Sequence, residues 1–469
     1  MSRPGAVIAT AIVAILGSFP SLPGQAADST VAFGAAAAAQ VDRIALDQVH
    51  AGRTPGIAIG IVEDGRLVYA KGFGFATLSP HSPMTPETEF YAGGLTAQFT
   101  AAAVLLLSQD GKVKLDDPVA KYIPELHVGN GVTIAQLLTQ TSGLPDYRGA
   151  RGLPTDMTKS VRTSQILAAV NAMQPRAAPG SVYANNPLNY FLAGLIVERV
   201  SGVTLSDYLE QHIFIPLVMN HTFLAGDSGI SSSHAIGYTR NGAKFSAAPV
   251  WDPSWLDGGG GLVTTVSDLA KWDIEMPVLL RVDSVRTIFT PGTPSGSIHY
   301  GMGWVVDRRG GMDFDWSNGE ISGYRAMNAT LPSQHISIIV LSNADGSHDS
   351  VTVPQVVSAQ ILNTIAPAPA ALDNPVIAQA KDWLERLASG RIDRSQLTPS
   401  FSAYLTDAVV VQAKFSSLGH LQEIVPLSST SENNGDTLYE FLVRYPRGSY
   451  HYHFEIAPSG KVDGISLIG

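Results

Sequence analysis

The pattern of apolar and polar positions predicts a helix, a hairpin and a second helix in the first quarter of the chain. Residues 35–50 are rich in alanine, with apolar positions at helical spacing. Apolar residues then alternate over 56–76 on both sides of Asp64-Gly65, which predicts a β-hairpin with a tight turn. Residues 96–109 are apolar on most faces and are soon followed by Gly111, which predicts a buried helix.

A long helical region separates this hairpin from the next strands. Residues 112–290 are mostly helical and loop-like in pattern, with glycine-rich interruptions such as 258–261. Strand patterns return at 324–331 and 336–341, and 351–365 predicts a closing helix. This order predicts an α+β fold: an antiparallel sheet flanked by helices with a large helical insertion, rather than a doubly wound parallel sheet.

The pattern changes after residue 365. Residues 366–371 read Ala-Pro-Ala-Pro-Ala-Ala, a composition typical of a semi-rigid linker. Beyond it, 382–388 predicts a helix, and a meander of short strands follows at 421–427, 437–445, 449–457 and 462–467. We therefore expect a first domain over 27–365, a linker over 366–375 and a small α+β domain over 376–469.

The first 26 residues have the composition of an export signal. Arg3 precedes a short apolar run over 6–17, and Gly24-Gln25-Ala26 supplies the small residues of a cleavage site. No later apolar stretch is long enough to span a bilayer. We expect the protein to be exported, periplasmic or secreted, with no transmembrane span in the mature chain.

Composition excludes two classes of function. The chain has 469 residues and no cysteine, which excludes thiol nucleophiles, thiolate metal sites and dithiol redox chemistry. Its formal net charge is -10 and only 15% of its residues are charged, so it offers no basic surface to the phosphates of a nucleic acid. We expect no nucleic-acid partner.

Seven short segments occur in the order of one enzyme family. Together they resemble the serine β-lactamase and penicillin-binding-protein family, in particular its class C, D-alanyl-D-alanine-peptidase and esterase branch. Besides the hairpin over 56–76, they are 99–107 with Asp110-Gly111-Lys112, 115–119, 137–144, Pro179-Gly180 with Tyr183-Ala184-Asn185, 260–262 with 268–270, and 301–304. The resemblance implies a β-lactamase/transpeptidase-like first domain.

The family's nucleophile and its lysine are both missing. The resemblance implies a serine at the start of the buried helix and a lysine three positions later, so that the ammonium can assist the hydroxyl. The matching segment aligns Gly94 with the serine and Ala97 with the lysine. No lysine in the chain has a serine three positions before it. The sequence therefore predicts a protein without catalysis, a pseudoenzyme.

The other two motifs are partly kept. Tyr183-Ala184-Asn185 matches the family's Tyr-x-Asn, but without the lysine we expect Tyr183 to stay neutral. Ser317-Asn318-Gly319 stands where the family has a lysine or histidine followed by x-Gly, so the cation is missing there too. Gln140 replaces a family histidine that the resemblance implies is structural.

We expect Gly94, Tyr183, Asn185, Ser317 and Gly319 to line a vestigial site that binds a peptide-like or acyl ligand without turnover. Loss of the serine side chain is expected to enlarge the cavity beside the backbone N–H donors. Restoring Gly94→Ser with Ala97→Lys is expected to recover detectable acylation.

Two alternatives stay open at this stage. One is an active esterase, peptidase or β-lactamase that uses a non-standard nucleophile such as Thr96. The other is an interaction protein that acts through its last domain, which resembles small NTF2-like modules on 389–393 and 397–399. His451 and His453 alternate on one predicted strand without a third ligand, so we expect no metal and no cofactor. The sequence identifies no protein partner.

Overall fold

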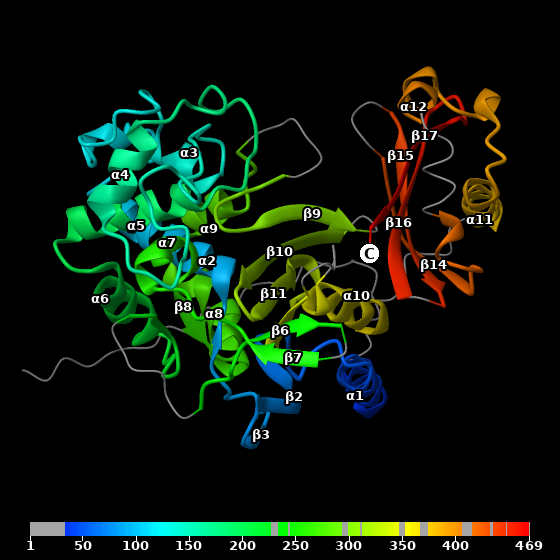
Figure 1. Ribbon diagram of the computed structural model, residues 1–469, viewed down its shortest axis with the longest axis horizontal. Helices are drawn as coiled ribbons and strands as arrows, with labels where there is room; N and C mark the ends of the chain where they lie inside the picture. The colour runs from blue at the N-terminus through cyan, green and yellow to red at the C-terminus, as the bar shows by residue number, and fades with distance from the viewer. Residues whose placement is uncertain are drawn as a thin grey trace, which may run out of the picture.

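A seven-stranded sheet forms the centre of the larger part of the chain (Figure 1). Its strands are β1 (Gly56–Glu63), β2 (Arg66–Leu78), β3 (His81–Pro83), β9 (Val305–Arg309), β10 (Met312–Ile321), β11 (Tyr324–Leu331) and β12 (Ile336–Ser342). They lie in the order β3-β2-β1-β12-β11-β10-β9, and every neighbouring pair is antiparallel. The antiparallel α+β fold expected from the sequence is confirmed.

This computed structural model describes most of the chain. The described residues are 33–226, 233–242, 244–292, 299–309, 312–346, 352–365, 374–405, 415–431, 435–446 and 448–468. The expected export signal over 1–26 and the Pro/Ala stretch of the expected linker lie outside them. The last two residues of that linker, 374 and 375, are helical and belong to the next element.

The β1–β2 hairpin forms at the predicted place because its turn suits the residues there. Asp64 and Gly65 have φ values of 49° and 70°. Two consecutive positive φ angles belong to the type I′ turn, whose twist matches that of antiparallel strands and which favours Asp-Gly. The hairpin then places the apolar residues of β1 on both faces of the sheet, where all of them are buried.

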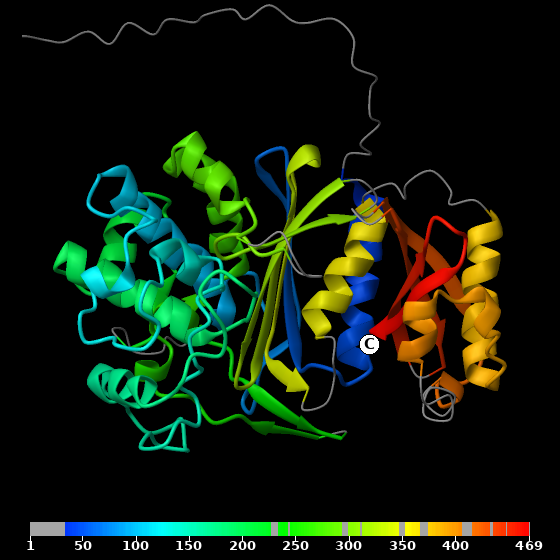
Figure 2. The ribbon, with the colours of Figure 1, turned by 90° about the horizontal axis from the view of Figure 1, so that it is seen from above.

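Two helices cover one face of the sheet and separate it from the last part of the chain (Figure 2). They are α1 (Ala35–His50) and α10 (Val353–Ile365). Ile44 of α1 and Val357 of α10 pack with Ile338 and Val340 of β12 in one apolar core. The helices start and end close to their predicted positions, since their apolar residues follow a helical period.

The opposite face carries the large helical insertion (Figure 2). Its helices are α2 (Thr96–Gln109), α3 (Ile134–Leu138), α4 (Thr163–Asn171), α5 (Pro187–Ser201), α6 (Leu205–Leu209), α7 (Asp257–Gly260), α8 (Val266–Leu279) and α9 (Val282–Ile288). Single-turn helices there include η1 (Gly93–Leu95), η2 (Val119–Lys121), η3 (Glu210–Phe214) and η4 (Pro253–Trp255), and η5 (Pro332–Gln334) joins β11 to β12. Two small sheets complete this part: β4 (Phe90–Tyr91) with β8 (Leu262–Thr264) and β5 (Phe223–Leu224), and β13 (Ala344–Gly346) with β6 (Tyr238–Asn241) and β7 (Lys244–Ala247).

A second, smaller module follows α10. It contains α11 (Asn374–Ser389), η6 (Arg394–Gln396), α12 (Pro399–Tyr404) and an antiparallel meander of β14 (Glu423–Ser431), β15 (Thr437–Tyr445), β16 (Gly448–Ile456) and β17 (Val462–Ile468). Trp383, Phe441 and Tyr452 are fully buried in its own core. Helix α11 begins eight residues earlier than predicted because Val376 and Ile377 also pack on this core.

No single helix among the described residues is both long enough and apolar enough to cross a bilayer. One bent pair, Pro187–Ser201 with Leu205–Phe214, passes the test by length and composition, with a 78° bend between its two helices. Helix α5 of this pair is largely buried within the core of the first part.

Candidate functional site

The resemblance places the family's catalytic groups at the start of α2. The hydroxyl group in that segment belongs to Thr96, and it already has hydrogen-bond partners. The Thr96 hydroxyl donates to the Gly93 carbonyl over 2.6 Å and accepts from the Leu262 amide over 3.0 Å. Its side chain is fully buried. Thr96 therefore joins the helix start to β8, and this role argues against Thr96 as a replacement nucleophile.

Strand β10 lies directly against Gly94. A Cβ atom added at Gly94 would lie 2.7 Å from the carbonyl oxygen of Asn318, and one added at Gly319 would lie 1.7 Å from that of Ala92. The two backbone segments can approach this closely because Gly94 and Gly319 have no side chain at the points of contact. The expected enlarged cavity at Gly94 is therefore wrong, since the backbone of β10 occupies that space.

Ala97, at the lysine position, faces the core. Its side chain is 5% exposed and belongs to the main apolar cluster. The segment that precedes β9 packs on the same turn of α2, because a Cβ atom at Gly303 would lie 2.8 Å from the Cα of Gln98. Gly94 and Ala97 thus lie between two backbone segments and carry neither a nucleophile nor a cation.

A tyrosine pair forms the next side of the site. The rings of Tyr183 and Tyr300 are 5.4 Å apart between centroids. Burial raises the pKa of Tyr183 and that of Tyr300 above the usual value of 10.0. Both phenols are therefore neutral at physiological pH, as expected for Tyr183.

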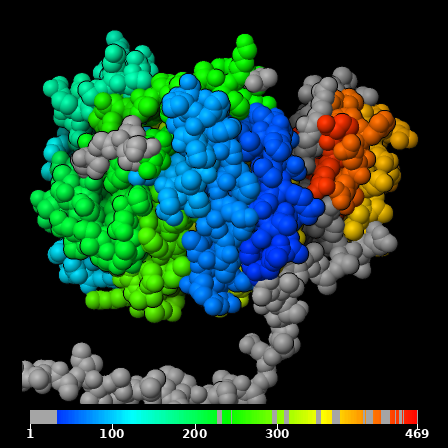
Figure 3. Space-filling view, turned by 90° about the horizontal axis from the view of Figure 1, so that it is seen from below, coloured from blue at the N-terminus to red at the C-terminus, as the bar shows by residue number. Residues whose placement is uncertain are grey.

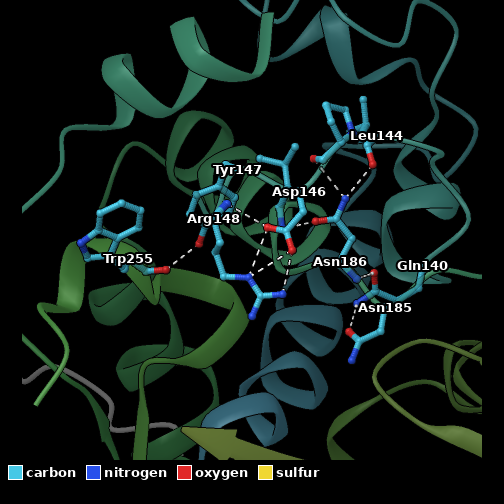
Figure 4. A network of polar contacts seen from close by, with 10 residues as sticks. Gln140, Leu144, Asp146, Tyr147, Arg148, Asn185, Asn186 and Trp255 are labelled. Atoms are coloured by element: carbon cyan, nitrogen blue, oxygen red, sulfur yellow. Dashed lines mark hydrogen bonds and ion pairs between the residues drawn. The ribbon is translucent and has the colours of Figure 1, made fainter. Parts of the chain in front are cut away.

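Gln140 connects the loop before the site to the start of α5 (Figure 4). Its Oε1 accepts from the Asn186 amide over 3.0 Å and from Asn189 Nδ2 over 2.5 Å, and its Nε2 donates to Asn185 Oδ1 over 3.4 Å. Gln140 is only 4% exposed, and its φ is 58°. The sequence marked Gln140 only as a departure from a structural histidine, whereas the structure makes it the centre of this network.

Asn186 continues the same network toward the next loop (Figure 4). Its side chain caps α5 by accepting from the Leu188 amide and donates to the Leu144 carbonyl over 2.9 Å. Nearby, Tyr147 donates to the Trp255 carbonyl over 2.6 Å. These bonds hold the segment of Tyr183 and Asn185 in place while leaving the Asn185 side chain at the surface.

The third motif lies in the middle of β10. Ser317 is opposite Asn328 of β11, and its side chain is 5% exposed. Gly319 is buried as well. Of the residues expected to line the site, Asn185 is exposed and Gly94 and Tyr183 are partly exposed. A ligand would therefore contact Asn185, Tyr183 and Gly94 much more readily than Ser317 or Gly319.

Asp273 of α8, which accepts a hydrogen bond from Asn328 of β11, has a raised pKa. Asn328 donates to Asp273 Oδ1 over 2.7 Å, while the other carboxyl oxygen of Asp273 is buried without a partner. Burial raises the pKa of Asp273 to about 7, although the hydrogen bond from Asn328 lowers it. The carboxyl group is thus mostly protonated below neutrality.

This shift predicts a pH-dependent stability. The unfolded chain releases this proton above about pH 4 and the folded protein only near pH 7, so the free energy of unfolding falls as the pH rises through this window. We expect Asp273→Asn to remove on the order of 2–4 kcal/mol of that fall between about pH 4 and pH 8. Denaturant titrations at several pH values measure it. Asp283→Asn, at a carboxylate that is 92% exposed, is the control. An unchanged pH profile for Asp273→Asn contradicts the assignment.

One group of carboxylates in the described residues could hold a metal ion. It consists of Asp436, Glu455 and Asp463 in the C-terminal module, with the ligand atoms within 4.8 Å of one another. The hydroxyls of Thr398 and Ser400 donate to Asp463. Of the two histidines considered from the sequence, His453 pairs with a carboxylate, since its Nε2 lies 3.1 Å from Glu440 Oε1.

Comparison with known proteins gives the class of this fold and site. Residues 41–361 match the sequence profile of the Beta-lactamase family. The putative penicillin-binding protein PbpX of Bacillus subtilis (strain 168) is 31% identical over 288 residues, which cover 60% of this chain and 69% of PbpX. The chain belongs to the β-lactamase family, whose members include penicillin-binding-protein-like hydrolases.

Further relatives agree on the fold. Protein flp of Staphylococcus aureus (strain MW2) is 27% identical over 339 residues, which cover 69% of this chain and 66% of its own. The octameric penicillin-binding protein homologue from Pyrococcus abyssi has a TM-score of 0.61 at 22% identity and covers 89% of this chain and 90% of its own. The D-amino acid amidase from Ochrobactrum anthropi SV3, complexed with L-phenylalanine, has a TM-score of 0.63 at 23% identity. The match covers 71% of this chain and 98% of the amidase chain.

Proposed function

We propose that this protein is an exported, non-catalytic member of its family that binds a peptide-like or acyl ligand without turnover. The observation that carries the proposal is the start of α2. Gly94 and Ala97 replace the groups that would attack and activate, and a Cβ atom at Gly94 would lie 2.7 Å from the Asn318 carbonyl oxygen of β10. Removal of a nucleophile alone costs on the order of a millionfold in rate.

The alternative of an active hydrolase has little support in this geometry. Thr96 is buried and bonded on both sides by backbone groups. Tyr183 and Tyr300 are neutral, so neither supplies a phenolate base to a replacement nucleophile. The other alternative is an interaction protein that acts through the C-terminal module, which resembles NTF2-like domains in sequence. The module has a separate apolar core, which supports its treatment as a unit.

The first test is covalent labelling. We expect no stoichiometric increase in intact mass after incubation with β-lactams, activated esters and fluorophosphonates, because the site offers no activated hydroxyl. The Bacillus subtilis relative PbpX serves as a comparison in the same panel. A stoichiometric adduct that peptide mapping locates to Thr96 or Ser317 contradicts the proposal and identifies the nucleophile.

The second test is reversible binding. We expect acyl-peptide ligands to bind with dissociation constants of order micromolar to millimolar. Asn185 supports this expectation, because its exposed amide can meet a ligand carbonyl. Asn185→Ala should weaken binding about tenfold, whereas Asn241→Ala, at an exposed asparagine of the β6–β7 hairpin, should not. Titration calorimetry on the full chain measures both. Equal affinity for the two variants places the ligand elsewhere.

A further inference from the structure

A polar cleft lies between the first part of the chain and the C-terminal module. Its volume is about 670 Å³, within the range of small-molecule sites. It is lined by residues of α1 and the turn after it, by residues of α10, and by Arg444 of β15. Figure 3 shows α1, in dark blue, beside the orange and red C-terminal module. None of the residues assigned above to the family site lines this cleft.

Positive charge is concentrated on the cleft in a chain whose net charge is -10. Arg43, Arg53 and Arg444 line it, against a single carboxylate, Asp47. Arg444 is also paired with Glu423 at 2.8 Å, so its charge is largely balanced within the module. The excess positive charge therefore comes from Arg43 and Arg53.

These two arginines are held by amides rather than by carboxylates. Arg43 donates to Gln40, and Arg53 donates to Gln48 Oε1 over 3.3 Å. Gln48 is only 5% exposed, so a buried side chain orients the Arg53 guanidinium. In the described ranges neither arginine forms an ion pair, although Asp47 lies one helical turn after Arg43. Each guanidinium keeps N–H donors for a ligand.

The remaining lining indicates the chemistry of that ligand. Guanidinium groups bind carboxylates and phosphates through two parallel hydrogen bonds. Gln48, Gln360 and Asn363 add amides, which both donate and accept and so match hydroxyl groups. We propose that this cleft binds a small hydroxylated anion, a sugar that carries a carboxylate or a phosphate. Because Arg444 belongs to β15, both parts of the chain line the cleft.

Titration calorimetry on the full chain tests this inference with glucuronate, glucose 6-phosphate and glucose as probes. We expect saturable binding of at least one anion, and the tighter of the two identifies the acid group. Glucose, which has the hydroxyls without the charge, should bind at least about tenfold more weakly. Binding of the anion should weaken as the salt concentration rises.

The double variant Arg43→Gln/Arg53→Gln should weaken binding of the anion about tenfold or more. Arg66→Gln, at an exposed arginine at the start of β2, is the matched control and should leave it unchanged. Thermal unfolding confirms that both variants are folded. The inference is wrong if neither anion saturates, if glucose binds as tightly, or if the folded double variant binds like the parent. Covalent labelling and Asn185→Ala test the family site separately, so the two proposals fail independently.

Discussion

Gly94→Ser combined with Ala97→Lys is expected to yield no acyl-enzyme, even though it rebuilds the family's serine and lysine. The Cβ of the new serine would lie 2.7 Å from the Asn318 carbonyl oxygen, closer than side chains pack in folded proteins. Because that neighbour is strand backbone, β10 must shift to accept it. We expect a loss of about 1–3 kcal/mol in unfolding free energy. This replaces the recovery of activity that the sequence alone suggested.

Two glycine substitutions separate the steric effect from the chemistry. Gly94→Ala adds the Cβ without the hydroxyl and should lose as much stability as Gly94→Ser. Gly260→Ala is the matched control, because its new Cβ would lie 3.5 Å from the nearest atom, an ordinary contact. Denaturant unfolding and intact mass after exposure to an activated ester provide the two measurements. A stable double variant that forms an adduct would show that β10 yields readily, and it would overturn the account of a closed site.

Gln140→Met is expected to destabilise the protein by about 2–4 kcal/mol, since it leaves two buried donors without an acceptor. These are the Asn186 amide and the Asn189 side chain, whose residues are 2% and 1% exposed. Methionine keeps a similar volume, so the loss reports on hydrogen bonds rather than on packing. Denaturant unfolding measures the change.

The same substitution should also affect ligand binding. Gln140 holds the segment that carries Tyr183 and Asn185, so its loss should weaken acyl-peptide binding together with stability. Gln379→Met is the control, at a partly exposed glutamine of α11 whose side chain forms no hydrogen bond within the described ranges. If Gln140→Met is as stable as this control, the network in Figure 4 does not organise the site.

Local pattern was a good guide wherever the apolar period was clear. Helices α1 and α2 have the predicted bounds. Strands β11 and β12 and the four strands of the C-terminal module begin and end within a few residues of their own predicted bounds. Strand β10 was not predicted, although Met312, Phe314 and Trp316 alternate with Asp313, Asp315 and Ser317 in its first half; Asn318-Gly319 then interrupts this short pattern. Its strand conformation comes from pairing with β11 and β9, partners that a local pattern does not contain.

The sequence by itself determined the family, because the matching segments run in order between residues 56 and 304. It also predicted the loss of the catalytic groups, because that prediction depends only on which residues stand at positions 94, 97 and 317. Only the tertiary structure showed which segments surround Gly94, Gln140 and the two arginines. Strand β10 closes on Gly94, Gln140 joins two loops, and Arg43 and Arg53 line a cleft completed by β15. These features depend on contacts between segments far apart in the chain, and their distances follow from packing rather than from any local period.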